Sequence, residues 1–204
     1  GLAIFAESSI FSLAGIAATV YGTKIIAAHQ AAISFTSLFY GVPLSIGIAA
    51  TITVGYAVGA KNLLAAKTYS YIARGTAVVL ALSICLYTFT NLPRIAGYYT
   101  NDPSMVGLIG SFLSYAVFFT VIDALGTPIQ GILRGYKDVR IISIIAISSF
   151  CGTSIPIAAF FTFVLNYGPY AIWIGLLGST AIAATLFTWR VWYIQHKKFK
   201  IINT

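Results

Sequence analysis

Residues 25–60 read IIAAHQAAISFTSLFYGVPLSIGIAATITVGYAVGA and contain no Asp, Glu, Lys or Arg. As an ideal helix this stretch is roughly 54 Å long, whereas the hydrocarbon core of a bilayer is about 30 Å thick. Pro43 lies inside it, and a proline within a helix removes one backbone hydrogen bond and favours a bend. We therefore expect one long membrane helix that is tilted or kinked and that projects beyond the bilayer.

The rest of the 204-residue chain has the same apolar character. Hydrophobic residues make up 59% and charged residues 8% of the sequence, and the mean hydropathy is +0.91. Charged residues make up about a quarter of a typical water-soluble domain. This composition therefore indicates an integral membrane protein and excludes soluble enzymes and disordered tails. The net charge of +8 does not predict a nucleic-acid partner, since the basic residues lie in short clusters between apolar runs.

The apolar runs predict an all-α fold, a polytopic membrane bundle of six transmembrane helices forming a single lobe over residues 1–204. The expected helices cover residues 2–22, 25–60, 64–91, 104–133, 140–166 and 169–195, and the third is expected to start as an amphipathic surface segment. Leu92–Pro103 combines prolines with charged side chains and is expected to be an exposed loop. Cys85 and Cys151 lie within apolar runs, where core packing is favoured over a disulfide or a metal site.

Basic residues are distributed unevenly between the two sides of the expected bundle. Only Lys24 and Arg94 fall on one side, and the other side holds Lys61, Lys67, Arg74, Arg134, Lys137, Arg140, Arg190, Lys197, Lys198 and Lys200. The positive-inside rule then places both termini in the cytoplasm and opposes an antiparallel dual-topology dimer, while a parallel dimer stays open. Gly1 opens an apolar run without a charged leader, so we expect the latter part of a longer chain rather than a signal peptide.

Two carboxylates inside apolar runs, Glu7 and Asp123, are the leading functional candidates. Charged groups in a membrane are costly and usually face a cavity or an ion path. Asp123 stands eleven residues before Arg134, or roughly 16 Å along a helix, which places it near the midplane. Glu7 has an alternative interpretation, in which it reaches the cytoplasmic interface. Asp102 in the expected outer loop and Asp138 between basic neighbours have simpler structural explanations.

Two carboxylates in one pocket can exchange protons or share a Na⁺ ion as hard oxygen ligands. The hydroxyls of Ser34 and Thr127, with Ser8 and Ser9, suit both ions, so the coupling ion stays open. His29 and Gln30 open the second helix on the outer side, where interfacial polarity explains them without a function in most cases. The interface is therefore the favoured explanation for His29, which ranks behind the two acids as a functional candidate, and Gln30 is a candidate lining residue.

Pro43, Pro128 and Pro156 interrupt three expected helices. A proline in a membrane helix frees a carbonyl group that a neighbour, water or ion must satisfy. Pro128 follows Asp123 by five residues, so a bend there can couple protonation to helix shape; static packing kinks are the alternative.

Other kinds of chemistry lack sequence support. An acidic, aromatic-rich cavity suits lipophilic cations, although the 13 Tyr and 14 Phe also suit an interfacial belt and packing against membrane lipid. The sequence contains no Ser/His/Asp grouping, no Cys/His metal spacing and no P-loop. We therefore expect a transporter that is not an enzyme, without a structural metal and with no cofactor beyond H⁺ or Na⁺ as coupling ion.

Several motifs resemble the C-terminal six-helix half of the multidrug and toxic compound extrusion (MATE) family, in particular its NorM-like bacterial branch. The similarity runs from Gly1 to about His196, and its most specific part is residues 131–138, GILRGYKD. The other stretches are GLAI with Glu7, AHQAA at 28–32, FTSL at 35–38, VPLS at 42–45, and VG and VGA at 54–60.

The resemblance implies a secondary antiporter of the bacterial inner membrane that exports cationic drugs and dyes while H⁺ or Na⁺ moves inward. Glu7 and Asp123 fall at the family's membrane-embedded acids, and the cavity lining is expected to include Gln30, Ser34, Phe119 and Thr127. The sequence departs from the family at Ala3, Ser34, Phe119 and Gly126, where Pro, Asn, Tyr and Gln are frequent. The coupling ion is therefore not assigned.

The resemblance also implies a missing partner, because the family's substrate cleft lies between two six-helix lobes. The chain is expected to be a fragment, one product of a split gene or half of a parallel dimer, with an N-terminal six-helix lobe absent. Two alternatives stay open: a lipid-linked oligosaccharide flippase, which the scarcity of embedded Lys and Arg opposes, and a non-transporting fragment or assembly subunit.

Overall fold

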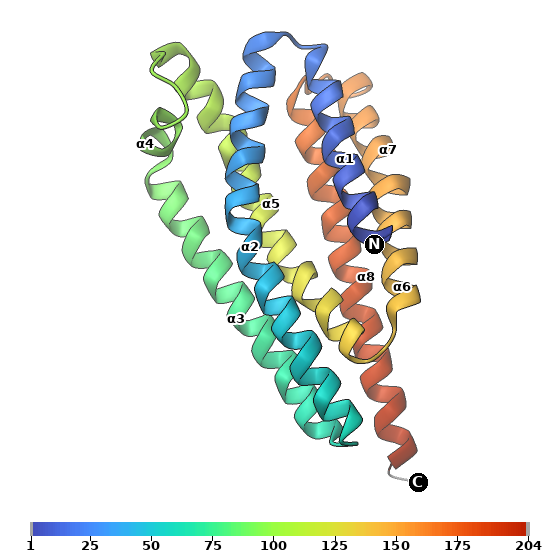
Figure 1. Ribbon diagram of the computed structural model, residues 1–204. Coiled ribbons are helices and arrows are strands. Elements are labelled where there is room, and N and C mark those ends of the chain that lie inside the picture. Colours follow the sequence, from blue (N-terminus) through green and yellow to red (C-terminus); the bar gives the residue numbers. More distant parts are fainter. Residues whose placement is uncertain (1, 203–204) are drawn as a thin grey trace.

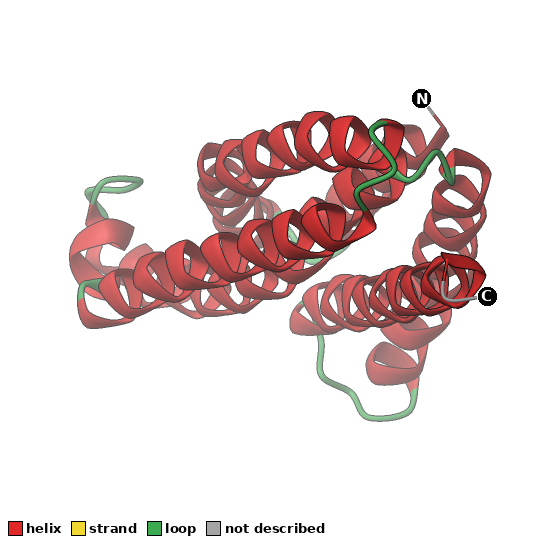
Figure 2. Cartoon of the chain, turned by 90° about the horizontal axis from the view of Figure 1, so that it is seen from below, coloured by secondary structure: helices red, strands yellow, loops and turns green. Residues whose placement is uncertain are grey.

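The computed structural model describes residues 2–202, with side chains described for residues 5–196, and this part of the chain is helical apart from short connections (Figures 1 and 2). The elements are α1 (Leu2–Thr19), α2 (Thr23–Gly59), α3 (Leu63–Thr90), α4 (Leu92–Gly97), α5 (Pro103–Gly135), α6 (Val139–Ala146), the π-helix η1 (Ile147–Cys151), α7 (Gly152–Phe163) and α8 (Tyr170–Ile202).

Five segments in the described region are long and apolar enough to cross a membrane: Thr23–Gly59, Leu63–Thr90, Pro103–Gly135, Val139–Phe163 and Tyr170–His196. The apolar part of α1, Phe5–Thr19, is shorter, and the chain enters it about halfway up the bundle (Figure 1). The all-α membrane bundle expected from hydropathy is thus confirmed, with α1 as the short sixth apolar helix.

The connection after α3 differs from the expected loop. Leu92–Gly97 forms the short helix α4, with Pro93 in its first turn, where a proline costs little because no backbone N–H is needed there. Arg94 donates from Nε to the Tyr98 hydroxyl at 3.2 Å. The prediction of an exposed loop over the whole of Leu92–Pro103 was wrong, because a proline that breaks a helix interior also fits a helix start.

The expected helix over residues 140–166 is also interrupted. It consists of α6, η1 and α7 in succession and ends at Phe163, followed by a turn with positive φ at Asn166 and Gly168. Pro156 has no backbone N–H to donate to the helical hydrogen bonds. The single π turn just before it accommodates the resulting shift in hydrogen-bond register. Cys151 lies in this π turn and is exposed, so the expectation that both cysteines belong to the core was wrong for Cys151.

Helices α2 and α5 approach closely and form the centre of the bundle. A Cβ atom on Gly131 would collide with the Gly47 carbonyl oxygen and lie 2.6 Å from its carbon. The Thr51 hydroxyl donates to the carbonyls of Gly47 at 2.9 Å and Gly131 at 3.0 Å. Small residues and shared hydroxyl bonds hold membrane helices together where lipid gives no hydrophobic driving force.

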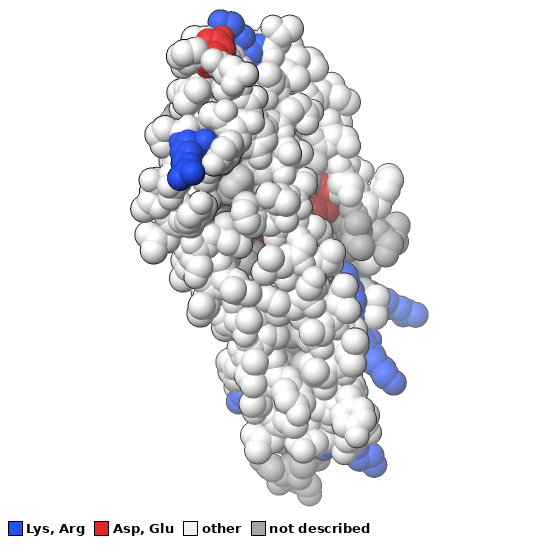
Figure 3. All heavy atoms as spheres, turned by 60° about the vertical axis from the view of Figure 1, so that its left-hand side comes forward, with Lys and Arg blue, Asp and Glu red and all other residues white. Residues whose placement is uncertain are grey.

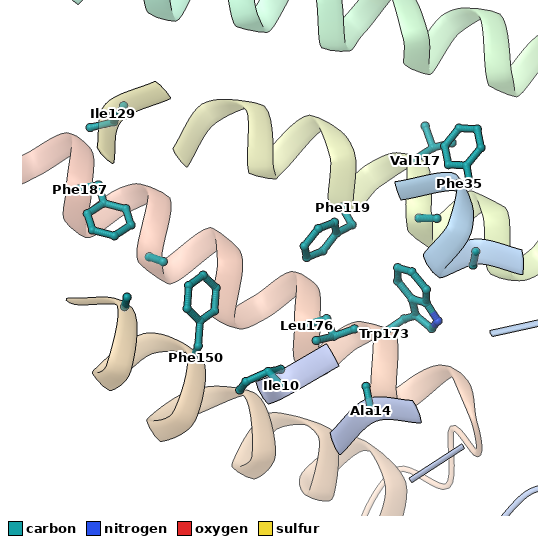
Figure 4. Packing of buried hydrophobic residues seen from close by; sticks show 14 of the residues in the cluster. Ile10, Ala14, Phe35, Val117, Phe119, Ile129, Phe150, Trp173, Leu176 and Phe187 are labelled. Carbon is teal, nitrogen blue, oxygen red and sulfur yellow. The ribbon is translucent and has the colours of Figure 1, made fainter. Parts of the chain in front are cut away.

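Around this contact, side chains from α5 and α8 pack with those of α1, α2 and η1, as Figure 4 shows. Trp173 is fully buried, and its ring meets Phe119 edge-on at 6.3 Å. Pro43 and Pro128 lie inside α2 and α5, which continue through them. This core fixes the position of α5 relative to α1 and α2.

On the face that Figure 3 shows, charged side chains are few: they lie near the upper end and along the lower half, with one acidic patch at about mid-height. Asp138, in the connection between α5 and α6, accepts a hydrogen bond from Arg190 Nε at 2.6 Å. Its partner is therefore a residue of α8 and not one of its sequence neighbours. This ion pair ties the end of α5 to α8.

A cavity with two carboxylates between α1, α2 and α5

A cavity of about 310 Å³ lies where α1, α2 and α5 meet. Its walls combine two acids, four hydroxyl residues, a tyrosine and three apolar side chains. They are Glu7, Ser8 and Phe11 on α1, Ile33, Thr36, Ser37 and Tyr40 on α2, and Phe119, Thr120 and Asp123 on α5. The volume falls at the lower end of the range for ligand pockets.

Glu7 reaches this cavity from α1, with Ser8 and Phe11 on the same face one turn apart. The side chain is half-buried and lies within electrostatic range of Asp123 and Arg134. Because α1 begins partway up the bundle (Figure 1), Glu7 does not lie at the lower end of the molecule. The interpretation in which Glu7 lines a cavity is thus favoured, and its depth in the membrane stays a prediction.

Asp123 enters the cavity from the middle of α5 and is only 6% exposed. Thr127, one turn further on, donates its hydroxyl to Asp123 Oδ1 at 2.7 Å. A hydrogen bond to a charged acceptor is short and about twice as strong as a neutral one. Thr127 thus fixes one oxygen of the carboxylate, and no other hydrogen bond to Asp123 is found among the described side chains, so its second oxygen is available for an ion or a proton.

The lining residues from α2 lie on one helical face, since Ile33, Thr36, Ser37 and Tyr40 are three or four residues apart from one turn to the next. The Thr36 hydroxyl donates to the Ile33 carbonyl at 2.9 Å. This leaves its oxygen lone pairs free to accept or to coordinate. Hydroxyl and carboxylate oxygens can coordinate Na⁺, and a carboxylate oxygen can bind H⁺.

Aromatic rings close the cavity beside the carboxylates. Phe11 and Phe119 meet edge-on at 5.3 Å across α1 and α5, and Tyr40 contributes a third ring from α2. Aromatic faces next to negative charge favour organic cations through cation–π attraction. The site can therefore hold a small inorganic cation at the acids or the charged part of an organic cation beside the rings.

The structure brings together some of the candidates chosen from sequence and separates others. Glu7, Asp123 and Phe119 share the cavity, and Thr127 supports Asp123 from behind. Gln30 lines a neighbouring cavity between α1 and α2, and Ser34 is exposed outside both. Gln30 and Ser34 lie in different surroundings because successive turns of α2 face different neighbouring elements.

Sequence reasoning missed Thr36, Ser37, Tyr40 and Thr120 as lining residues. Thr120 precedes Asp123 by three residues, so the helical spacing around the acid carried that signal. The positions on α2 carried no such signal, since nothing in the sequence specifies which face of that helix meets α1 and α5. Tyr40 in particular could not be distinguished from the other tyrosines.

No group of three or more His, Cys, Asp or Glu side chains that would hold a resident metal occurs within the described residues. Two carboxylates with hydroxyl neighbours suit a transported ion better than a structural divalent metal, which takes more protein ligands. Pro128 lies beside the site, with its Cα 3.5 Å from the Cβ position of Gly47. The kink candidate on α5 is thus packed against α2.

Fold and site together define a polytopic membrane protein with an acidic, aromatic-lined cavity inside one helical lobe. The MatE family model matches residues 1–160, most of the chain, and the chain belongs to this family.

Curated relatives carry the name "Probable multidrug resistance protein NorM". The relative from Streptococcus pneumoniae (strain ATCC BAA-255 / R6) is 38% identical over 200 residues, which cover 98% of this chain and 44% of the relative. The relative from Listeria monocytogenes serovar 1/2a is 41% identical over 199 residues, covering 97% and 43%. The chain therefore spans less than half the length of the curated relatives it matches.

Solved structures of MATE transporters share the fold. A crystal structure of MATE in the bent conformation gives a TM-score of 0.91 at 20% identity and covers 100% of this chain and 45% of that one. Inward-facing and outward-facing structures of a multidrug resistance MATE family transporter give TM-scores of 0.86 and 0.85, each at 20% identity and covering 98% of this chain and 46% and 44% of theirs. The chain matches one half of each structure and is a multi-pass membrane protein.

Proposed function

We propose that this chain is the C-terminal six-helix half of a secondary transporter, and not an enzyme, that exports cationic drugs in antiport with H⁺ or Na⁺. The partner half is an N-terminal six-helix lobe that completes the substrate cleft. The observation that carries the proposal is the cavity in which Glu7 and Asp123 face hydroxyl and aromatic side chains. Names and lengths of the relatives agree with it.

Ion coupling follows from competition for the same negative charge. Two carboxylates in a low-dielectric pocket repel each other, so a proton or Na⁺ that binds there relieves the repulsion. A cationic drug gains from the same charge, and occupancy by the ion lowers the affinity for the drug. Such mutual exclusion between two cations couples the entry of one to the exit of the other.

Alternating access requires lobes that move while each keeps its fold. The TM-scores of 0.86 and 0.85 against inward- and outward-facing structures are nearly equal, which supports motion of this half as a unit. The uneven distribution of Lys and Arg supports an orientation with the ends of α2 and α8 in the cytoplasm. We place the protein in the bacterial inner membrane, with its C-terminus cytoplasmic.

A lipid-linked oligosaccharide flippase is the alternative within the same fold. A pyrophosphate group requires cationic side chains in the cavity, and the described lining contains two carboxylates and no Lys or Arg. The charge of the site therefore favours a cationic substrate. A non-transporting fragment is the other alternative, and it predicts no flux at all.

The test is ethidium efflux from proteoliposomes that contain a two-lobe protein carrying this chain, with H⁺ and Na⁺ gradients applied separately. We expect Asp123→Asn and Glu7→Gln to reduce gradient-driven efflux by about 5- to 150-fold, as the loss of a coupling energy of about 1–3 kcal/mol predicts. Asp102→Asn is the matched control, because this acid lies at the start of the same helix and outside the cavity. Unchanged efflux in both cavity variants would contradict the site.

A further inference from the structure

His29 on α2 is the one ionisable side chain in the described region that is fully buried, with 0% exposure. Neither of its ring nitrogens has a hydrogen-bond partner within the described structure. Its ring meets Trp173 of α8 edge-on at 5.8 Å, and the indole Nε1 is also buried without a partner. Three polar atoms without partners therefore lie in one place, where sequence alone suggested an interfacial histidine.

Buried polar atoms without hydrogen bonds destabilise the fold unless a small molecule bonds to them. Each buried donor or acceptor without a partner costs about 1–3 kcal/mol. A phenylalanine would make the same edge-on contact with Trp173 without this cost. The imidazole therefore requires a hydrogen-bonding guest, and in a protein interior that guest is water.

A route for water lies beside the ring. A cavity of about 440 Å³ between α1 and α2 is lined by His29 together with Ser12, Gly15, Thr19 and Gln30. This volume exceeds by far what one water molecule needs, and the lining supplies polar partners. The cavity reaches towards the α1–α2 connection, the end of the bundle that carries Lys24 and Arg94.

The same cavity adjoins the carboxylate site. Phe11 and Ile33 line both cavities and so form the partition between them. Behind the partition, Trp173 contacts Phe119, which lines the carboxylate cavity. Apolar side chains thus separate the two cavities.

Few ionisable groups surround His29, and the α1 lining of its cavity is uncharged. The nearest ionisable residues along the surrounding helices are Lys24 on α2, Glu7 and Tyr21 on α1, Tyr115 and Asp123 on α5 and Tyr170 on α8. The charged side chains among them are Lys24 at the outer end and the two carboxylates on the inner side.

We propose that the cavity between α1 and α2 is a water-filled vestibule and that His29 is a second protonation site at its inner end. Hydronium in the vestibule transfers a proton to the lone pair of the neutral imidazole, so that one O–H bond breaks and one N–H bond forms. Because the ring nitrogens are buried, this contact requires the side chains that cover them to move. The apolar side chains of Phe11 and Ile33 separate this site from the acids, so the protonation of His29 does not rest on the proposed antiport.

The tryptophans of this chain provide a direct reporter. Trp189 and Trp192 are 59% and 55% exposed, so Trp189→Phe and Trp192→Phe leave the buried Trp173 as the single indole of this half at little cost. The experiment uses a two-lobe protein that carries this chain, with the tryptophans of the other lobe replaced by Phe. A protonated imidazole in contact with an indole ring quenches its fluorescence more strongly than a neutral one. The chain has only two histidines, and His196→Gln removes the other.

The experiment titrates Trp173 emission from about pH 8 to about pH 5, the usual range of imidazole, in protein reconstituted into vesicles with sidedness determined. We expect emission to fall on acidification from the outer side, and the pH dependence to disappear in His29→Phe and persist in His196→Gln. His29→Gln is the second variant in case His29→Phe does not fold, as judged by gel filtration and circular dichroism.

Emission that does not respond to pH, that still responds in both His29 variants, or that responds only to acidification from the cytoplasmic side would overturn the proposal. The readout is an equilibrium signal and requires no transport. It therefore stays informative in Glu7→Gln and Asp123→Asn variants, and a transport failure in those variants does not count against the vestibule.

Discussion

The close contact between Gly131 of α5 and Gly47 of α2 predicts that Gly131→Ala lowers the thermal stability of the bundle. The added Cβ would lie 2.6 Å from the Gly47 carbonyl carbon and 2.7 Å from its Cα, whereas carbon atoms at optimal contact are about 3.5–4.0 Å apart. Both neighbours are helix backbone and cannot rotate away. The two helices must therefore separate by about 1 Å at the centre of the bundle.

Separation costs stability in two ways. Overpacking of a close contact costs about 1–3 kcal/mol. The bond of 3.0 Å from the Thr51 hydroxyl to the Gly131 carbonyl would lengthen beyond hydrogen-bond range, which costs about 0.5–1.5 kcal/mol more. On the scale known for soluble domains of this size, about 2–4 kcal/mol lowers the melting temperature by about 4–15 °C.

The assay is the fraction of monodisperse protein that survives heating, followed by fluorescence-detected gel filtration in detergent. Gly110→Ala on the same helix is the matched control, because no atom lies within 4 Å of its Cβ position. Both variants gain the same helix propensity from alanine, about 1 kcal/mol, so their difference isolates the contact. Equal melting temperatures for the two variants would refute the close packing of α2 on α5.

Three further predictions follow from local contacts. Thr127→Val removes the 2.7 Å hydrogen bond to Asp123 and should weaken the apparent affinity for the coupling ion by about tenfold or more, with Thr127→Ser as the control in ion-dependent efflux. The hydrogen bonds from Ser104 hold the pKa of Asp102, the N-cap of α5, below its usual value. The ionised carboxylate therefore stabilises the first turn of α5 at neutral pH, and this stabilisation is lost as pH falls through the pKa of the folded state. The protection factors of the amides in that turn, which correct the exchange rates for the pH dependence of intrinsic exchange, should fall below about pH 4 in the wild type and stay level in Asp102→Asn. Asn62→Ala removes the side-chain cap of α3, a 3.0 Å bond to the amide three residues on, and should cost about 0.5–2 kcal/mol in thermal unfolding, while Asn62→Asp, which keeps the acceptor oxygen, should not.

The membrane bundle and the leading acids could be predicted from sequence because the membrane constrains composition strongly. A charge-free apolar run longer than the bilayer is thick has few alternatives, and a carboxylate within such a run is costly enough to indicate a function. Glu7 and Asp123 therefore emerged without any contact information. The pairing of Thr127 with Asp123 also follows from a spacing of four residues along one helix.

Rotational positions of helices could not be predicted in the same way. Around a membrane helix, apolar side chains face lipid as well as protein, so hydrophobicity does not tell the buried face from the exposed one. This is why Ser34 was grouped with the cavity lining although it is exposed, and why Tyr40 was passed over. The same ambiguity placed Cys151 in the core and His29 at the interface.

Hydropathy and charge act on each residue separately, so they are enough to predict an all-helical membrane lobe, the charge imbalance of its connections and its two embedded acids. The shared cavity of Glu7 and Asp123, and the burial of His29 beside Trp173, arise only when the helices pack together. Those outcomes depend on contacts between helices far apart in the chain, such as the glycine contact of α2 with α5. The shape and spacing of small residues on two different helices set that contact, and no single stretch of sequence contains it.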